Sequence, residues 1–162
     1  MEPVYCRAGS TLHFSGYPMK VIGMSLFLHE LARSFDAQVG SVGRDRFLQD
    51  VGRQMAARLG LPPCQTLEML EMEMNAALAL LEWGHVTLAV DTLDKKLVLR
   101  HGGLPLVGSM GDPPGWWLVP ALAGLYSAWL EQQPDSLSDA RMNWSVEKNS
   151  EATHVVVLTY GH

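Results

Sequence analysis

The residues of this chain best suited to chemistry are histidines, carboxylates and a glycine-rich loop, and the histidines form no known catalytic pattern. His29 and Glu30 open a stretch that approaches the zinc-protease motif, but Arg33 stands where that motif requires a second histidine. The six histidines lie far apart, and none is paired with a cysteine at zinc-finger spacing. We therefore predict no metal and no cofactor, with His29 on a helix surface.

The loop around Ser109 resembles a nucleophile elbow only superficially. Val107 occupies the place of the first glycine in the Gly-x-Ser-x-Gly pattern. Gly108 and Gly111 fit neither a phosphate-binding loop nor a dinucleotide fingerprint. The sequence favours a tight loop that uses the conformational freedom of glycine.

Carboxylates are available for glycosidase-type acid–base chemistry, among them Glu71, Glu73, Asp91 and Asp112. That chemistry needs two carboxylates facing each other across a cleft. Glu68, Glu71 and Glu82 instead share one edge of a predicted helix, which is typical of a solvated strip. Among the tryptophans, only Trp116 stands outside a core-like position and is a candidate for stacking on a sugar ring. We predict that the protein is not an enzyme.

Length and composition restrict the class of protein further. The 162 residues fit one domain, and the charged fraction of 18% is below the usual value of about 25%, so part of the surface is expected to be covered by protein. The net charge of −5 argues against a nucleic-acid partner. Cys6 and Cys64 allow one disulfide, but free thiols are favoured. Without a standard secretory signal or an 18-residue uncharged apolar run, we expect a soluble cytoplasmic protein.

Hydrophobic periodicity predicts the elements that would position these residues. Residues 1–24 are predicted to form an N-terminal arm, and residues 25–162 a single α+β domain with about four helices and a small, largely antiparallel four-stranded sheet. The helices are expected at 25–39, 44–59, 66–82 and 117–132, and the strands at 85–90, 97–99, 142–146 and 154–160. Gly124 should weaken its helix by about 1 kcal/mol unless another backbone packs closely there.

The predicted helix from Thr66 to Glu82 is unusual because two opposite faces are apolar. One stripe contains Leu67, Leu70, Met74, Ala77, Leu78 and Leu81, and the other contains Met69, Met72, Ala76, Ala79, Leu80 and Trp83. A helix that is apolar nearly all round is buried on several sides. It is therefore either the centre of the fold or a boundary between subunits. We favour the boundary, with one stripe in the monomer core and the other against a second copy.

Several segments together resemble the D proteins of bacterial cellulose synthase operons. The resemblance extends over about residues 25–160. It is carried by FLQDVGRQMA from Phe47, PCQT from Pro63, EMNA from Glu73, WGHV from Trp83, LPLVGS from Leu104, GWWL from Gly115 and GLYSAWL from Gly124. Their order and spacing are specific, although no single motif is.

The resemblance implies a non-enzymatic accessory scaffold that assembles into an octamer of paired subunits. In that family the subunits form a cylinder whose passageways receive the emerging β-1,4-glucan chains, which helps synthase complexes to produce crystalline ribbons. It also implies two partners, the synthase complex and a small Pro-rich protein. Because the family's N-terminal segments line the passageways, Tyr17, Lys20 and Val21 are expected to contact glucan.

The oligomer interface is expected at four residues of the second stripe, Met69, Met72, Leu80 and Trp83. We expect the protein on the cytoplasmic side of the inner-membrane synthase rather than in the periplasm. Two alternatives stay open. One is a small glucan-acting hydrolase with paired carboxylates, and the other is a sensor that buries a small ligand near the same helix.

Overall fold

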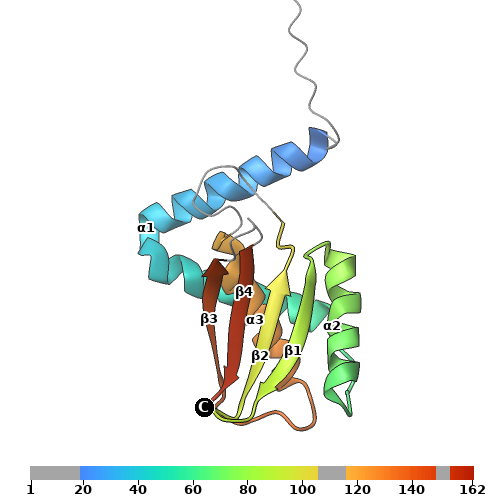
Figure 1. Cartoon of the computed structure of the whole chain (residues 1–162). Helices are drawn as coiled ribbons and strands as arrows, with labels where there is room; N and C mark the ends of the chain where they lie inside the picture. Colours follow the sequence, from blue (N-terminus) through green and yellow to red (C-terminus); the bar gives the residue numbers. More distant parts are fainter. Residues whose placement is uncertain (1–18, 106–115, 149–153) are drawn as a thin grey trace, which may run out of the picture.

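The computed structural model describes residues 19–105, 116–148 and 154–162, which form one antiparallel sheet with helices on one of its faces and along one edge (Figure 1). The elements in chain order are α1 (Met19–Arg58), α2 (Leu67–Leu81), β1 (His85–Asp91), β2 (Lys96–Gly102), the 3-10 turn η1 (Trp116–Leu118), α3 (Val119–Glu131), β3 (Arg141–Lys148) and β4 (His154–Gly161). The strand order is β1-β2-β4-β3, and every neighbouring pair is antiparallel. The predicted α+β class and its four-stranded sheet are confirmed. The loop around Ser109 and residue Asp112 lie outside the described residues.

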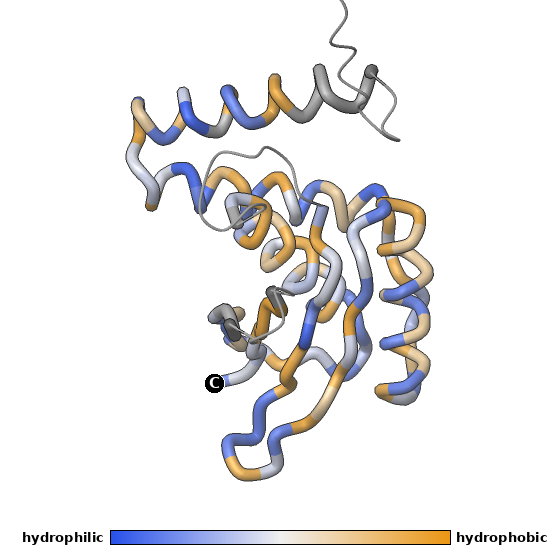
Figure 2. The backbone as a smooth tube through the Cα atoms, turned by 45° about the horizontal axis from the view of Figure 1, so that its top comes forward, coloured by the Kyte–Doolittle hydropathy of each residue, from blue (hydrophilic) through white to orange (hydrophobic). Residues whose placement is uncertain are grey.

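A kink at Gly40 divides α1, where the sequence predicted two separate helices. Gly40 has φ 76°, a conformation that glycine adopts without steric cost. Across the kink, the rings of Phe35 and Phe47 lie 4.6 Å apart, and Arg44 is 3.5 Å from the carboxylate of Asp36. These contacts fold the two halves back toward each other (Figure 2). The helix also begins at Met19 rather than at Ser25, so part of the predicted arm is helical.

The expectation that His29 lies on the helix surface is wrong. His29 is buried, and its Nε2 has no hydrogen-bond partner among the described residues. His29 lies two turns before Asp36, so both residues are on the same face of α1, from which Asp36 reaches Arg44 across the kink. Phe47, which was expected on the apolar face of the second half, remains 45% exposed. The buried face there passes through Leu48, Gly52 and Ala56.

The second half of α1 crosses α3 where each helix carries a glycine. A Cβ added to Gly124 would overlap the carbonyl oxygen of Gln49, and one added to Gly52 would overlap that of Ala121. The backbones therefore touch without intervening side chains. This close backbone packing is the alternative that the sequence offered to a helix weakened by its central glycine.

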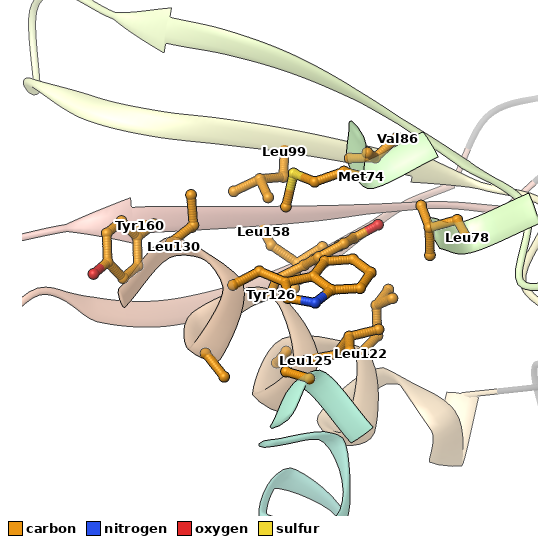
Figure 3. Close-up of a cluster of buried hydrophobic side chains, with 14 of the residues drawn as sticks. Met74, Leu78, Val86, Leu99, Leu122, Leu125, Tyr126, Leu130, Leu158 and Tyr160 are labelled. Atoms are coloured by element: carbon orange, nitrogen blue, oxygen red, sulfur yellow. The ribbon is translucent and has the colours of Figure 1, made fainter. Parts of the chain in front are cut away.

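α3 is the central helix of the fold, because it lies between the sheet and α1. Eleven of its residues are buried, and within the described ranges α1 contacts α3 and η1 but no strand. Figure 3 shows Leu122, Leu125 and Tyr126 of α3 in one buried cluster with Leu99 and Leu158 of the sheet. The centre of the fold is therefore not the helix that is apolar on two faces.

A buried polar pair interrupts this apolar core. His101 Nδ1 and the Tyr126 hydroxyl lie 2.6 Å apart, and both side chains are fully buried. Burial lowers the pKa of His101 to about 4, with the backbone of Trp83 opposing this change and His85 adding to it. Burial also raises the pKa of Tyr126 well above its usual value. Both groups are therefore neutral at physiological pH.

Candidate assembly surface on α2

Interactions within a few residues determine where α2 begins and ends. Thr66 is the N-cap, and its hydroxyl accepts a hydrogen bond from Met69 N at 3.2 Å. Glu68 lies in the first turn, where the helix dipole favours a negative charge. At the other end, Glu82 adopts a left-handed conformation with φ 55° and stops the helix. The N-terminal boundary predicted from the sequence is correct.

The two apolar stripes of α2 have different surroundings. Leu70, Met74, Ala77 and Leu78 are buried in the core. On the opposite stripe, Met69 is 42%, Met72 61% and Leu80 77% exposed. The first stripe therefore belongs to the monomer core, and the second remains uncovered. The uncovered stripe is the one at which the oligomer interface was expected.

Trp83 does not share the exposure of the other three predicted interface residues. It is half-buried and packs against the core. Because Glu82 ends the helix, Trp83 no longer follows the spacing of 100° per residue that placed it on the outer stripe. We define the outer stripe as Met69, Met72, Ala76, Ala79 and Leu80, all of which are exposed.

The expectation of a solvated polar strip is wrong for Glu71, and the neighbouring Asn75 also bonds to the sheet. The Asn75 side chain donates to Val86 O and accepts from Val86 N, both at 2.8 Å. A carboxylate oxygen of Glu71 accepts from Leu88 N at 2.7 Å. These bonds occupy backbone groups on the outer edge of β1, beside which α2 lies (Figure 1). The clue in the sequence is Asn75 itself, because asparagine is a poor helix former placed between two apolar stripes.

The structure does not bring the other predicted site residues together. Tyr17 lies outside the described residues, and Lys20 and Val21 lie in the first turn of α1.

Asp91 caps the β1–β2 turn by accepting hydrogen bonds from Leu93 N at 2.9 Å and Asp94 N at 3.2 Å. Within the ranges that the structure describes, no three His, Cys, Asp or Glu residues are grouped to hold a metal ion. Cys64 is a free thiol.

A hollow of about 270 Å³ lies between the start of α2 and the end of α3. Its apolar lining includes Leu70, Leu97 and Leu130. Of the described residues that line it, only Asp135 carries a carboxylate. Two facing carboxylates are required for glycoside hydrolysis, so this hollow does not provide that geometry.

Comparison with known proteins identifies the family. The sequence profile described as the D-subunit of cellulose synthase matches residues 13–161. The chain belongs to the cellulose synthase D-subunit family. It is 46% identical over 115 residues to a cellulose synthase operon protein D of Komagataeibacter xylinus, covering 71% of this chain and 74% of that protein. It is 39% identical over 137 residues to the operon protein D of Komagataeibacter sucrofermentans, covering 83% of this chain and 88% of that protein.

Membership of the D-subunit family places the chain in bacterial cellulose synthesis, as the sequence resemblance predicted. The resemblance was visible because the matching segments are distributed over most of the chain, from α1 to α3. Among the described residues, no helix is both long and apolar enough to cross a lipid bilayer.

Proposed function

We propose that this member of the D-subunit family is a non-catalytic scaffold that self-assembles into a cylinder. The cylinder organises synthase complexes and guides β-1,4-glucan chains toward crystalline ribbons. The observation that carries the proposal is the outer stripe of α2, where Met69, Met72 and Leu80 are exposed to water. The opposite stripe of the same helix already packs in the monomer core, so the monomer itself does not cover these side chains.

The free energy gained by burying the outer stripe favours a protein partner. Full burial of a large apolar side chain is worth about 1.5–3 kcal/mol. The stripe runs along one helix face, so a single partner surface can cover Met69, Met72 and Leu80 together. The low charged fraction of 18% agrees with a surface that is partly covered in the assembly.

The structural hydrogen bond of Glu71 favours a scaffold over the glucan-acting hydrolase. This carboxylate accepts a backbone hydrogen bond at the edge of β1 and so has a structural role. The hydrolase alternative predicts that the purified protein releases sugars from cellodextrins. No detectable turnover by the wild type at micromolar concentration would dispose of it.

The N-terminal segment is proposed to contact the glucan chains. Tyr17, Lys20 and Val21 at the start of α1 are the candidates. The synthase complex and a small Pro-rich protein are the proposed partners, with the assembly on the cytoplasmic side of the inner membrane. Deleting residues 1–24 should leave the assembly mass unchanged but alter the organisation of the cellulose.

The decisive experiment is a mass measurement of the purified protein by light scattering. We expect an assembly several times heavier than the 17.9 kDa chain, consistent with an octamer of paired subunits. Replacing Met72 and Leu80 with glutamate should reduce that mass while leaving the monomer folded, because both side chains are exposed. A stable wild-type monomer at micromolar concentration would overturn the proposal.

A further inference from the structure

The two outer edges of the sheet have different neighbours. The edge of β1 is covered by α2, whose Asn75 and Glu71 side chains bond to its backbone. β3 is the terminal strand at the other edge. Among the described strands, β3 pairs only with β4, so its other side has no strand partner. An uncovered edge presents unpaired N–H and C=O groups that can template another strand.

The strand register identifies which groups of β3 point outward. Val86 and Leu88 direct their backbone groups away from β2, toward α2. Hydrogen-bonded and non-hydrogen-bonded pairs alternate along an antiparallel ladder. Following the strand pairing across β2 and β4, the residues of β3 whose backbone groups face the open edge are Met142, Trp144 and Val146.

We propose that this edge is covered by β3 of a second copy, paired antiparallel about a two-fold axis at Trp144. The inference rests on the self-association in the proposed function and names a contact that produces it. In this arrangement Trp144 pairs with its own copy, and Met142 pairs with position 146 of the other chain. The sheets of the two copies join into one, and the interface is isologous.

The sequence of β3 is self-complementary in this register. Asn143 of one copy stands opposite Ser145 of the other, and both side chains are exposed polar groups able to hydrogen-bond. An unrelated extended peptide would have no reason to match these positions, so a second copy is the favoured occupant.

Burial at this end of the core points to the same partner. Met142 and Trp144 pack against the core but are only half-buried. They lie at the edge where the apolar layer between the sheet and α3 ends. A second copy would place its own Trp144 beside the first and extend that layer. Burial of large aromatic side chains is a dominant contribution to interface energy.

This pairing leaves the outer stripe of α2 available for another contact. α2 lies beside β1, which is the opposite end of the sheet from β3 (Figure 1). In a pair joined through β3, the two outer stripes therefore lie at the two far ends. Each pair can then join further pairs through those ends, which suits a closed assembly of paired subunits.

A charge-swap experiment tests the pairing. Asn143→Lys with Ser145→Lys places lysines opposite lysines across the proposed axis. This variant should form a lighter assembly than the wild type, with its helix content preserved because both positions are exposed. The corresponding double glutamate variant should behave in the same way. An equal mixture of the two at low salt should regain the wild-type mass, since opposite charges then face each other.

The matched control places the same charges at the covered edge. Thr87 and Ala89 of β1 are exposed and share the sheet face of Ser145 and Asn143. Thr87→Lys with Ala89→Lys should leave the assembly mass unchanged. The β3 pairing is overturned if the Asn143 and Ser145 variants keep the wild-type mass, or if mixing them restores nothing.

A cross-linking experiment checks the register. Positions 143 and 145 form a non-hydrogen-bonded pair in the proposed ladder, where Cα atoms lie about 4.5 Å apart and a disulfide can close. The double cysteine variant should give a covalent dimer on mild oxidation, and each single variant should not. A wild-type monomer would refute self-association as a whole, whereas an intact assembly without this cross-link would refute the β3 contact alone.

Discussion

The crossing of α1 and α3 predicts that Gly124→Ala destabilises the protein, although alanine is the better helix former. A Cβ at position 124 would lie 2.8 Å from the carbonyl carbon of Gln49 and 2.9 Å from its Cα. Carbon atoms in favourable contact are about 3.5–4.0 Å apart. The two helices must therefore separate by about 1 Å, and no flexible side chain is present to absorb the change.

The expected magnitude follows from two opposing effects. Overpacking a close-packed interior costs about 1–3 kcal/mol, and a rigid backbone neighbour places this site at the upper end. Alanine stabilises the helix by about 1 kcal/mol relative to glycine because its helix propensity is higher. The net loss in the free energy of unfolding should be about 2 kcal/mol. For a chain of this length, that corresponds to a fall in Tm of about 4–8 °C.

Urea unfolding followed by tryptophan fluorescence, at fixed protein concentration, measures this loss. Gly60→Ala is the matched control, since the nearest atom to an added Cβ there is the Gln132 side-chain oxygen at 3.8 Å. That variant should unfold within about 0.5 kcal/mol of the wild type. Gly52→Ala should cost about as much as Gly124→Ala, and the double variant less than the sum, because the same separation relieves both overlaps. A Gly124→Ala protein as stable as the wild type would refute the reasoning.

Two further predictions concern the bonded edge of β1 and the buried histidine. Asn75→Ala should lower the free energy of unfolding by about 1–2 kcal/mol and speed hydrogen exchange at Val86 N, since it leaves both backbone groups of Val86 without their partner. Glu68→Ala on the exposed face of α2 is its control, and equal exchange in both variants would contradict the edge interaction. Stability should fall between pH 6.5 and about 4, because the unfolded state protonates His101 at its usual pKa of 6.5 while the folded state does not. His101 contributes at most about 3 kcal/mol to this fall. His101→Gln should flatten the pH dependence measured by urea unfolding, and an unchanged slope would show that another group is responsible.

Local pattern predicted most of the secondary structure. The cap at Thr66, the hairpin after Gly84 and the alternation near each strand follow from interactions within a few residues, and the structure confirms them. The family was also accessible from sequence, because matching segments extend over most of the chain. The close contact at Gly124 was one of two options in the sequence, because a glycine there weakens the helix unless another backbone packs closely.

Other features depend on which distant segments meet. The sequence did not show that α3 rather than α2 occupies the centre, because both helices are strongly apolar and periodicity does not identify their partners. It misplaced His29 because the inward face of α1 is set by the kink at Gly40.

The sequence by itself determined that α2 has two apolar stripes with polar residues between them. Only the tertiary structure decided that the Met74 stripe enters the core and that Met72 remains in water. It also decided that Asn75 forms hydrogen bonds with the backbone of β1 instead of with solvent. The physical reason is that helical spacing fixes the relative directions of side chains on one helix, whereas the sheet packed beside α2 fixes what each direction meets.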